Sequence, residues 1–201
     1  MVIKLETKRL ILRKPKISDW KDIVEGCKDL EVAQNTVSIE HPYTKKHADL
    51  FISEVRKNWT KKNNDYVFFI ELKSEKKIIG GIALHDIEKT NRIGQTGSWI
   101  NKKYWRKGYI TEAKVAVNEF AFNKLKLRKL WTTVFTNNRA SRKVQESIGY
   151  KSEGKFRRHF LSKSTGIIHD ANIYGLLKED WKKKLPKLKK KLERKIKNDK
   201  K

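Results

Sequence analysis

Apolar and polar residues alternate in seven short stretches of the chain, and a period of two residues predicts β-strands. In the first stretch, residues 7–13, Leu10 and Leu12 share one face. The other six stretches are residues 66–72, 77–85, 95–101, 130–136, 150–161 and 166–176. Polar turns separate the second, third and fourth stretches, which indicates an antiparallel meander, and the last two stretches are spaced as a hairpin.

A helical period is present in four other stretches: residues 18–30, 44–59, 109–126 and 138–148. The third stretch is the clearest, because its apolar residues recur at intervals of three and four: Ala113, Ala116, Val117, Phe120 and Ala121. The elements follow one another in the order β-α-α-β-β-β-α-β-α-β-β. This order predicts a mixed α/β domain built of packed layers.

The composition excludes several classes of protein. The chain has 201 residues with 6 Trp, 6 Tyr and 8 Phe, which is enough aromatic surface for the core of one domain and too much for a disordered chain. A single cysteine, Cys27, excludes a disulfide scaffold. Because no apolar run approaches the length of a membrane span and residues 1–10 lack the apolar block of a secretory signal, we expect a soluble, cytoplasmic protein.

The charge is strongly positive and uneven. The chain carries 49 Lys and Arg against 23 Asp and Glu, a net charge of +26, and residues 182–201 alone contribute +10. Such a surface attracts RNA, anionic membranes or phosphorylated small molecules, although a lysine-rich composition can also serve solubility alone. We divide the chain into a domain at residues 1–181 and a basic tail at 182–201. The tail has a narrow apolar stripe that could form a helical arm, but we expect a solvated, frayed terminus.

The segment from Gly97 to Thr111, GSWINKKYWRKGYIT, carries the most informative chemistry. A strand ends, a basic loop follows, and Gly108 lets the backbone turn sharply into the third predicted helix. The first N–H groups of a helix have no intrahelical acceptor, so they form a natural cradle for a phosphate. Arg106 and Lys107 add charge beside it, with Lys102 and Lys103 nearby. The residues therefore indicate an anion site, although a basic turn without a ligand has the same pattern.

The run WRKGYITEA resembles the pyrophosphate loop of the GNAT acyltransferase superfamily, whose pattern is Gln/Arg-x-x-Gly-x-Gly/Ala. It is closer still to the branch of ribosomal-protein N-terminal (alanine) acetyltransferases, which it matches at Lys107, Gly108, Tyr109, Thr111, Glu112 and Ala113. It departs at Arg106, where the branch often has Gly, and at Ile110, where Gly or Ala is usual. The stretches ETKRLILR, IGQTGSWI and TNNRASRKVQESIGYKSEG also resemble that branch, so the resemblance covers roughly residues 6–181.

This resemblance implies a GNAT fold and an acetyl-CoA cosubstrate. The sheet would be mixed and mostly antiparallel, with about seven strands, flanked by about four helices and splayed between the fourth and fifth strands. The splay would lie near Trp99–Ile100 and Phe135–Thr136 and would hold the pantetheine arm. The loop would hold the pyrophosphate through Arg106, Lys107, Gly108, Tyr109, Ile110 and Thr111. A backbone N–H near Ile100 would stabilise the oxyanion, and we expect no metal.

The resemblance also suggests acid–base roles. The Tyr that many superfamily members use as the acid is replaced by Gln145, so Ser141 becomes the candidate acid, with Asn138 beside it in contact with CoA. Both residues would contact the cofactor, although Asn138 is equally well explained as a helix cap and Ser141 as a first-turn polar residue. The usual Glu of the fourth strand is Gln95 here, which cannot accept a proton. Water, His85 or Asp86 would have to serve as the base.

We therefore expect an N-acetyltransferase that acts on a primary amine, with a protein N-terminal α-amine as the first candidate. The acceptor would be contacted by the loop at residues 32–43 and by the hairpin at residues 157–169. A small-molecule amine is the alternative acceptor. A ribosome- or RNA-associated binding protein with weak catalysis is the alternative function, motivated by Gln95 and by the net charge of +26. Either a monomer or a homodimer fits the sequence.

Overall fold

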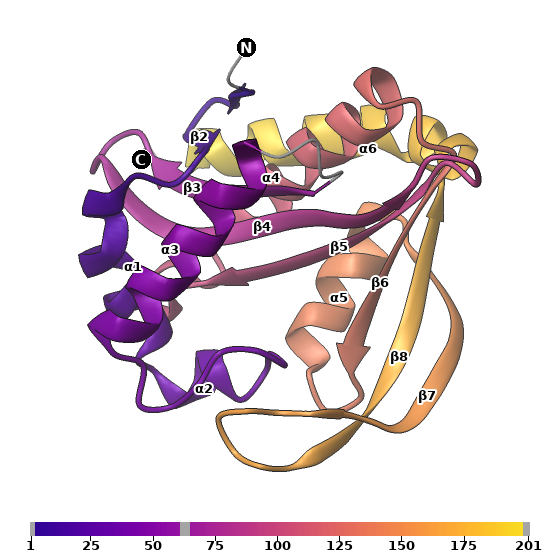
Figure 1. Cartoon of the computed structure of the whole chain (residues 1–201). Helices are drawn as coiled ribbons and strands as arrows, with labels where there is room; N and C mark the ends of the chain where they lie inside the picture. The colour runs from indigo at the N-terminus through magenta and orange to yellow at the C-terminus, as the bar shows by residue number, and fades with distance from the viewer. Residues whose placement is uncertain (1–2, 61–64, 199–201) are drawn as a thin grey trace.

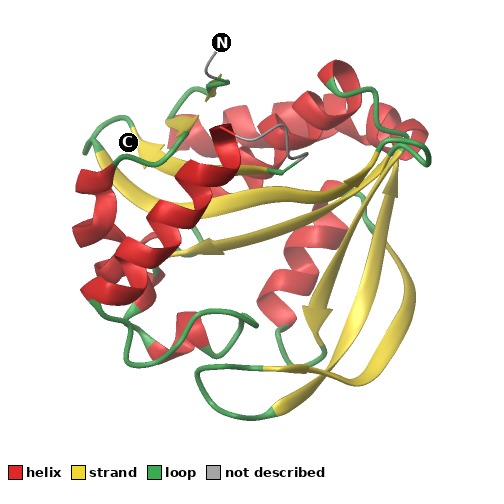
Figure 2. Ribbon diagram, viewed as in Figure 1, coloured by secondary structure: helices red, strands yellow, loops and turns green. Residues whose placement is uncertain are grey.

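An eight-stranded sheet forms the centre of the molecule in the computed structural model, which describes residues 3–60 and 65–198 (Figures 1 and 2). The order of strands across the sheet is β1-β2-β3-β4-β5-β6-β8-β7. Their bounds are β1 Leu5–Glu6, β2 Leu10–Arg13, β3 Tyr66–Leu72, β4 Lys77–Glu88, β5 Ile93–Ile100, β6 Lys129–Phe135, β7 Lys151–Leu161 and β8 Ile168–Leu177. All seven predicted strands are therefore present, and the two-residue β1 adds an eighth.

Helices cover both faces of this sheet. Their bounds are α1 Trp20–Cys27, α2 Leu30–Ala33, α3 Lys45–Thr60, α4 Tyr109–Glu119, α5 Arg139–Ile148 and α6 Lys178–Asn198. The first predicted helix, residues 18–30, is split, because Asp29 has an extended backbone and its side chain caps α2. The end of the third predicted helix continues beyond α4 as a turn of π-helix, Phe120–Lys124.

Successive residues of the central strands feed two separate cores. Phe68, Ile70 and Leu72 of β3 pack with buried residues of α4, α5 and α6, whereas Phe69 packs with α1 and α3. This follows from the period of two residues in a strand, which directs neighbouring side chains to opposite faces. The helices α1 and α3 therefore lie on one face of the sheet, and α4, α5 and α6 lie on the other (Figure 1).

The expectation of a frayed C-terminus is wrong. The chain is helical from Lys178 to Asn198, which crosses the boundary that the charge distribution suggested at residue 181. Trp181, Leu188 and Ile196 are buried in α6. Trp181 and Leu188 pack into the core on the α4 side, while most lysines of the helix are exposed, so burial outweighs the mutual repulsion of the charges.

The sheet contains one parallel pair, β5 and β6, and that pair separates along its length. Registered partners are Ile93 with Lys129, Gly94 with Leu130, and Gln95 with Trp131. The Thr132 hydroxyl then donates to the Thr96 carbonyl at 2.6 Å. Within the part of the chain that the structure describes, the ladder has no further pairs, although both strands continue. We call the region between residues 97–100 and 132–135 the wedge; it confirms the splay expected between the fourth and fifth predicted strands.

Candidate functional site

Backbone groups of β5 point into the wedge. The N–H of Asn101 donates to the Ile79 carbonyl of β4 at 2.9 Å. Hydrogen-bonding direction alternates along an antiparallel strand, so the N–H of Ile100, the preceding residue, points away from β4 and towards β6. The Ile100 carbonyl accepts a hydrogen bond from the Trp105 indole at 2.9 Å. The N–H of Ile100 thus lies where an oxygen atom in the wedge would meet it.

The Trp99 side chain lies on the face of the sheet that α1 and α3 cover, between α1 and β4. A Cβ atom at Gly26 or at Gly81 would come within 2.7 Å of its indole ring, so both glycines make room for it. The indole packs against the α1–α3 core. By the same alternation the N–H and C=O of Trp99 point to β4, so Ile100 rather than Trp99 presents its backbone N–H to the wedge, and the Trp99 side chain packs the strand against α1.

The loop that follows β5 turns twice through left-handed backbone. Arg106 has φ 62° and Gly108 has φ 79°, and Gly108 is the N-cap residue of α4. A glycine cap supplies no side-chain acceptor, so the N–H groups of Gly108, Ile110 and Thr111 remain directed out of the helix start. Alternation of backbone handedness also turns successive N–H groups to one side, as in anion-binding nests. The loop therefore has the backbone geometry that an anion cradle requires, and a diphosphate held there stays a prediction.

Two lysines of the turn between β5 and this loop form ion pairs with carboxylates outside the loop. Lys102 forms ion pairs with Glu31 and, at 3.4 Å, with Asp29, and Lys103 pairs with Glu25 at 2.7 Å. The hydrogen bond from Lys103, with a second from Lys28, lowers the pKa of Glu25 to about 2. These lysines neutralise carboxylates of α1 and α2, whereas Arg106 and Lys107 of the loop itself are exposed and add positive charge beside it.

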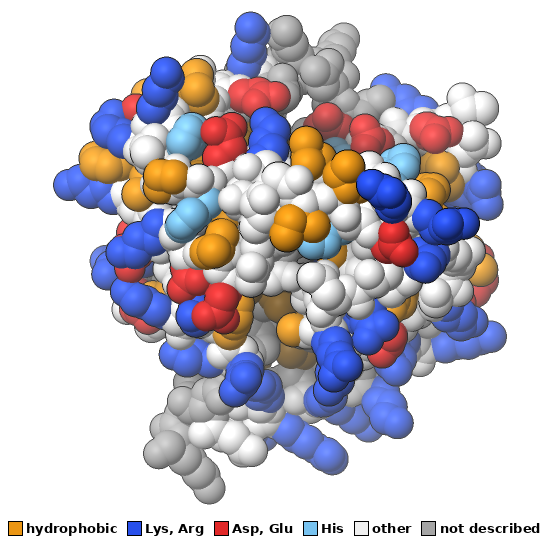
Figure 3. Space-filling view, turned by 90° about the horizontal axis from the view of Figure 1, so that it is seen from below, with side chains coloured by type: hydrophobic (Ala, Val, Ile, Leu, Met, Phe, Trp, Pro, Cys, Tyr) orange, Lys and Arg blue, Asp and Glu red, His pale blue; other side chains and the backbone are white. Residues whose placement is uncertain are grey.

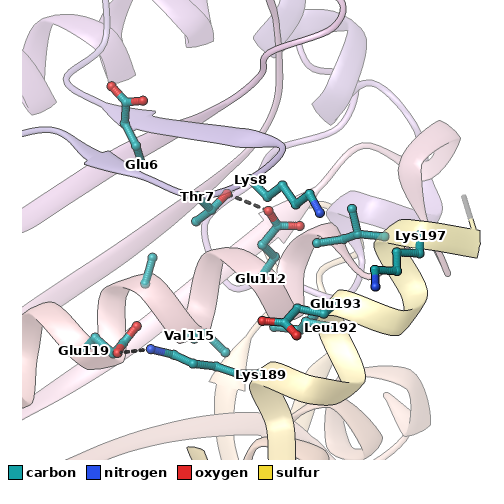
Figure 4. Close-up of a pocket in the computed structure, with 12 residues that line it drawn as sticks. Glu6, Thr7, Lys8, Glu112, Val115, Glu119, Lys189, Leu192, Glu193 and Lys197 are labelled. Atoms are coloured by element: carbon teal, nitrogen blue, oxygen red, sulfur yellow. Dashed lines mark hydrogen bonds and ion pairs between the residues drawn. The ribbon is translucent and has the colours of Figure 1, made fainter. Parts of the chain in front are cut away.

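Glu112 connects the start of α4 to the N-terminal strands, a contact that sequence reasoning missed. Its carboxylate accepts from the Thr7 hydroxyl at 2.6 Å (Figure 4). It also accepts from the Arg9 N–H and Nε at 3.0 and 2.7 Å. The Arg9 guanidinium also lies 4.3 Å from the centre of the Tyr109 ring. The only sign of this contact in the sequence is that residues 7–9 and residues 111–113 both lie in stretches that resemble the same branch of acetyltransferases.

Asn138 and Ser141 lie together where β6 ends and α5 begins. The Asn138 side-chain oxygen accepts from the Ser141 N–H at 2.9 Å, so Asn138 is the N-cap of α5. Its own N–H donates to the Phe135 carbonyl at 2.9 Å. The helix-cap reading of Asn138 is thus confirmed, while its amide NH₂ and the half-buried Ser141 hydroxyl remain available as donors beside the open end of β6.

The candidate bases lie at the other end of β5. Gln95 is paired with His85 on β4 and with Trp131 on β6, where the wedge is closed. At about 3.4 Å per residue, this position is about 17 Å along the strand from Ile100. His85 is moreover engaged with Asp86, at 2.9 Å. The three side chains are therefore separated from the Ile100 N–H.

A buried polar cluster, which the sequence did not reveal, lies between α4, β5 and the residue after α5. The Tyr150 hydroxyl is 3.3 Å from the Thr96 hydroxyl, and the Lys114 Nζ lies 6.0 Å from the centre of the Tyr150 ring. Burial lowers the pKa of Lys114 to about 8 and raises the pKa of Tyr150 to about 12. The cluster therefore places a readily neutralised amine near the closed end of the wedge.

The two segments expected to contact the acceptor come together. The Lys163 N–H donates to the Val37 carbonyl at 3.1 Å, and the Lys163 ammonium lies 3.7 Å from Glu40. Exposed apolar side chains surround this junction: Val37, Leu161, Ile167 and Ile168. Figure 3 shows hydrophobic and histidine side chains interspersed with lysines and arginines on the lower face of the molecule. The loop and the hairpin thus form one continuous surface.

Within residues 3–60 and 65–198, no group of three or more His, Cys, Asp or Glu side chains is arranged to hold a metal ion. No helix in these ranges combines the length and the apolar character needed to cross a membrane.

Comparisons with known proteins agree with this geometry. Residues 9–151 match the acetyltransferase (GNAT) domain family. The chain is 36% identical over 104 residues to "Putative ribosomal N-acetyltransferase YdaF" of Bacillus subtilis (strain 168), a match that covers 52% of this chain and only 56% of that protein. Among solved structures, an acetyltransferase (GNAT family) from Bacillus anthracis has a TM-score of 0.74 and 27% identity, covering 88% of this chain and 99% of that one. The fold also matches Microcin C7 self immunity acetyltransferase MccE, solved in complex with acetyl-CoA and AMP, with a TM-score of 0.73, 17% identity and coverage of 85% and 93%.

Proposed function

Because this chain belongs to the GNAT acetyltransferase family, we propose that it transfers the acetyl group of acetyl-CoA to the N-terminal α-amine of a ribosomal protein. The observation that carries the proposal is the wedge, whose strands separate after Gln95 and Trp131, followed directly by the loop at Gly108. The similarity to YdaF supports a ribosomal acceptor.

The cosubstrate would be held in two places. The N–H groups of residues 106–111 and the side chains of Arg106 and Lys107 would bind its diphosphate at the start of α4, where the helix dipole favours anions. The Ile100 N–H would face the pantetheine arm in the wedge, and the packed Trp99 side chain would hold that part of β5 in place. The amide NH₂ of Asn138, which the cap leaves unused, would donate to the cosubstrate from the opposite side.

Transfer would proceed by direct attack of the neutral amine on the thioester carbonyl. The carbon–nitrogen bond forms, the carbon–sulfur bond breaks, and the amine proton leaves to water. The departing thiolate takes a proton from the Ser141 hydroxyl, which regains one from water in the same step. The Ile100 N–H would donate to the carbonyl oxygen as it gains charge, a contribution of about 3–4 kcal/mol in comparable sites. Holding the amine beside the thioester supplies much of the remaining acceleration.

The acceptor would approach from the surface formed by the 32–43 loop and the 157–169 hairpin. The hydrogen bond between Lys163 and Val37 joins these segments, so an acceptor would meet both at once. Exposed apolar side chains there fit a peptide better than a small polycation, which a chain with a net charge of +26 would also repel. A small-molecule amine is therefore the second candidate acceptor.

The test is an acceptor screen in which released CoA thiol is detected. N-terminal peptides of ribosomal proteins and a set of small amines are compared, with the same peptides carrying a blocked N-terminus as controls. We expect thiol release with free peptides only. Turnover with small amines alone would contradict a peptide acceptor and support a small-molecule amine as the acceptor. No release with any amine, combined with tight and salt-sensitive RNA binding, would favour a binding protein instead.

A further inference from the structure

The C-terminal helix reaches the loop before α4 through Lys195. The Lys195 ammonium donates to the Arg106 carbonyl at 2.5 Å, across 89 residues of sequence. Its methylene groups pass closely over Gly108, because a Cβ atom there would lie 3.0 Å from Lys195 Cδ and 3.2 Å from Cε. A side chain at residue 108 would therefore displace the lysine, so glycine serves this contact as well as the turn.

The position of Lys195 is fixed by its neighbours on α6. Ile196, the next residue, is buried, and so is Leu188 two turns earlier. Lys189 pairs with Glu119 of α4 at 2.8 Å (Figure 4). A groove of about 370 Å³ lies between α6, α4 and the β1–β2 turn. The helices α4 and α6 therefore contact each other at the edges of this groove and are not packed together along their whole length. Lys195 is consequently delivered to the loop by a helix that is anchored elsewhere.

The contact determines the direction of one peptide group of the loop. In a trans peptide the C=O and the following N–H point in opposite directions. Because Lys195 holds the Arg106 carbonyl on the α6 side, the Lys107 N–H is turned to the opposite side. The ammonium also offsets the partial negative charge of a carbonyl that would otherwise repel an anion. Arg106 has φ 62°, which costs energy for a residue with a side chain, and a charged donor on its carbonyl stabilises that conformation.

We propose that Lys195 is a positioning residue for the diphosphate-binding loop, so that α6 forms part of the cosubstrate site. This inference rests on the proposed function in one respect, namely that residues 106–111 bind the diphosphate of CoA. Lys195 acts through the Arg106–Lys107 peptide and takes no part in acyl transfer. The basic C-terminal segment accordingly has a role within the enzyme, independent of any binding to RNA.

The test compares Lys195→Met with Lys190→Met, which removes an equal charge from an exposed position of the same helix. Dissociation constants for CoA and for pantetheine, which lacks the diphosphate, are measured by calorimetry. We expect Lys195→Met to weaken CoA about ten-fold and to leave pantetheine unchanged, whereas Lys190→Met changes neither. Lys195→Arg should restore most of the CoA affinity. The same pattern is expected in KM for acetyl-CoA against S-acetylpantetheine, with kcat unchanged.

The outcomes separate this proposal from the proposed function. Equal weakening of both ligands by Lys195→Met, or no weakening of CoA, overturns the role of Lys195. Wild-type protein that binds CoA through the loop but releases no thiol with any amine contradicts the proposed function alone. Wild-type protein that does not bind CoA overturns both. Thermal unfolding of each variant checks that the fold is retained, and Lys195→Gln, which removes the charge and shortens the side chain, provides the same comparison of CoA with pantetheine if Lys195→Met fails to fold.

Discussion

Glu112 and Arg9 form a buried ion pair that fastens the N-terminal strands to the first turn of α4, with 2.7 Å between the Glu112 carboxylate and Arg9 Nε. Their side chains are only 5% and 12% exposed. Since Glu112 lies one turn after Gly108, the pair also fixes the start of the helix that would receive the diphosphate. Stability and the proposed cosubstrate binding would therefore be coupled at this point.

Replacing Glu112 with Gln should destabilise the protein severely. The substitution leaves the Arg9 charge buried and weakly compensated, so the free energy of unfolding should fall by about 3 kcal/mol or more. Glu119→Gln is the matched control, because its pair with Lys189 is exposed and contributes at most about 1 kcal/mol. Urea unfolding measures both. An equal fall in the free energy of unfolding of the two variants would show that the buried pair contributes no more to stability than the exposed pair.

Gly81→Ala should disturb the wall of the wedge. The added methyl would lie 2.7 Å from the Trp99 indole nitrogen, so the ring or the strand must move, at a cost of about 1–3 kcal/mol. At Gly97 on β5 the nearest atom to an added methyl is His85 Nε2 at 3.6 Å, an ordinary contact. Unfolding free energies and kcat of Gly81→Ala and Gly97→Ala are compared. A Gly81 variant with the stability and turnover of its control would contradict the packing argument.

Ser141→Ala should reduce turnover far more than it weakens cosubstrate binding. Loss of a general acid typically lowers kcat by about 100-fold or more. Ser147→Ala on the same helix is the control, because the Ser147 hydroxyl only donates to the Val144 carbonyl at 2.8 Å. Steady-state kinetics and the dissociation constant of CoA are measured for both. Unchanged kcat in Ser141→Ala would remove Ser141 from the acid role.

The side-chain amide of Asn138 should have two separable roles. Its oxygen caps α5, and its NH₂ group would bind the cosubstrate. Asn138→Ala removes both and should cost about 1 kcal/mol of stability as well as raising KM for acetyl-CoA. Asn138→Asp keeps an acceptor for the Ser141 N–H and should retain stability, but it lacks the NH₂ donor and should still raise KM. Thermal unfolding and KM are the measurements. A wild-type KM in Asn138→Asp would leave Asn138 with the cap alone.

Lys114 should make stability depend on pH. Burial lowers its pKa to about 8 from the ordinary value of 10.5, so the unfolded chain binds more protons between these two values. The contribution of Lys114 to the free energy of unfolding is therefore lowest below pH 8, and it rises as the pH increases to about 10.5. Lys114→Met should remove the cost, raising the free energy of unfolding at pH 7 by up to about 3 kcal/mol.

The advantage of Lys114→Met should shrink as the pH rises. Urea unfolding of wild type and variant at a series of pH values from 7 to 10.5 checks this, with Lys190→Met as an exposed control that is expected to show no such trend. A difference between wild type and Lys114→Met that stays constant over the whole range would contradict the assigned shift.

The resemblance and local patterns together anticipated the frame of the site. The loop at Arg106–Thr111 and the cap at Asn138 depend on residues that are close in sequence. The splay beyond Gln95 lies between strands that are distant in sequence, and the resemblance alone implied it. The candidate bases could not be judged in this way. Order along the chain suggested His85, but antiparallel pairing carries it to the closed end of the wedge, opposite Gln95.

By itself the sequence determined the strands, the main helices and the glycine turn at residue 108, because periodicity and backbone preference act over a few residues. Only the tertiary structure decided which distant groups meet: Arg9 with Glu112 across 103 residues, and Lys195 with Arg106 across 89. It also decided that α6 is folded, since an apolar stripe is stable only where another surface covers it. Local patterns carry no information about such partners, because burial and charge pairing arise only when the layers pack.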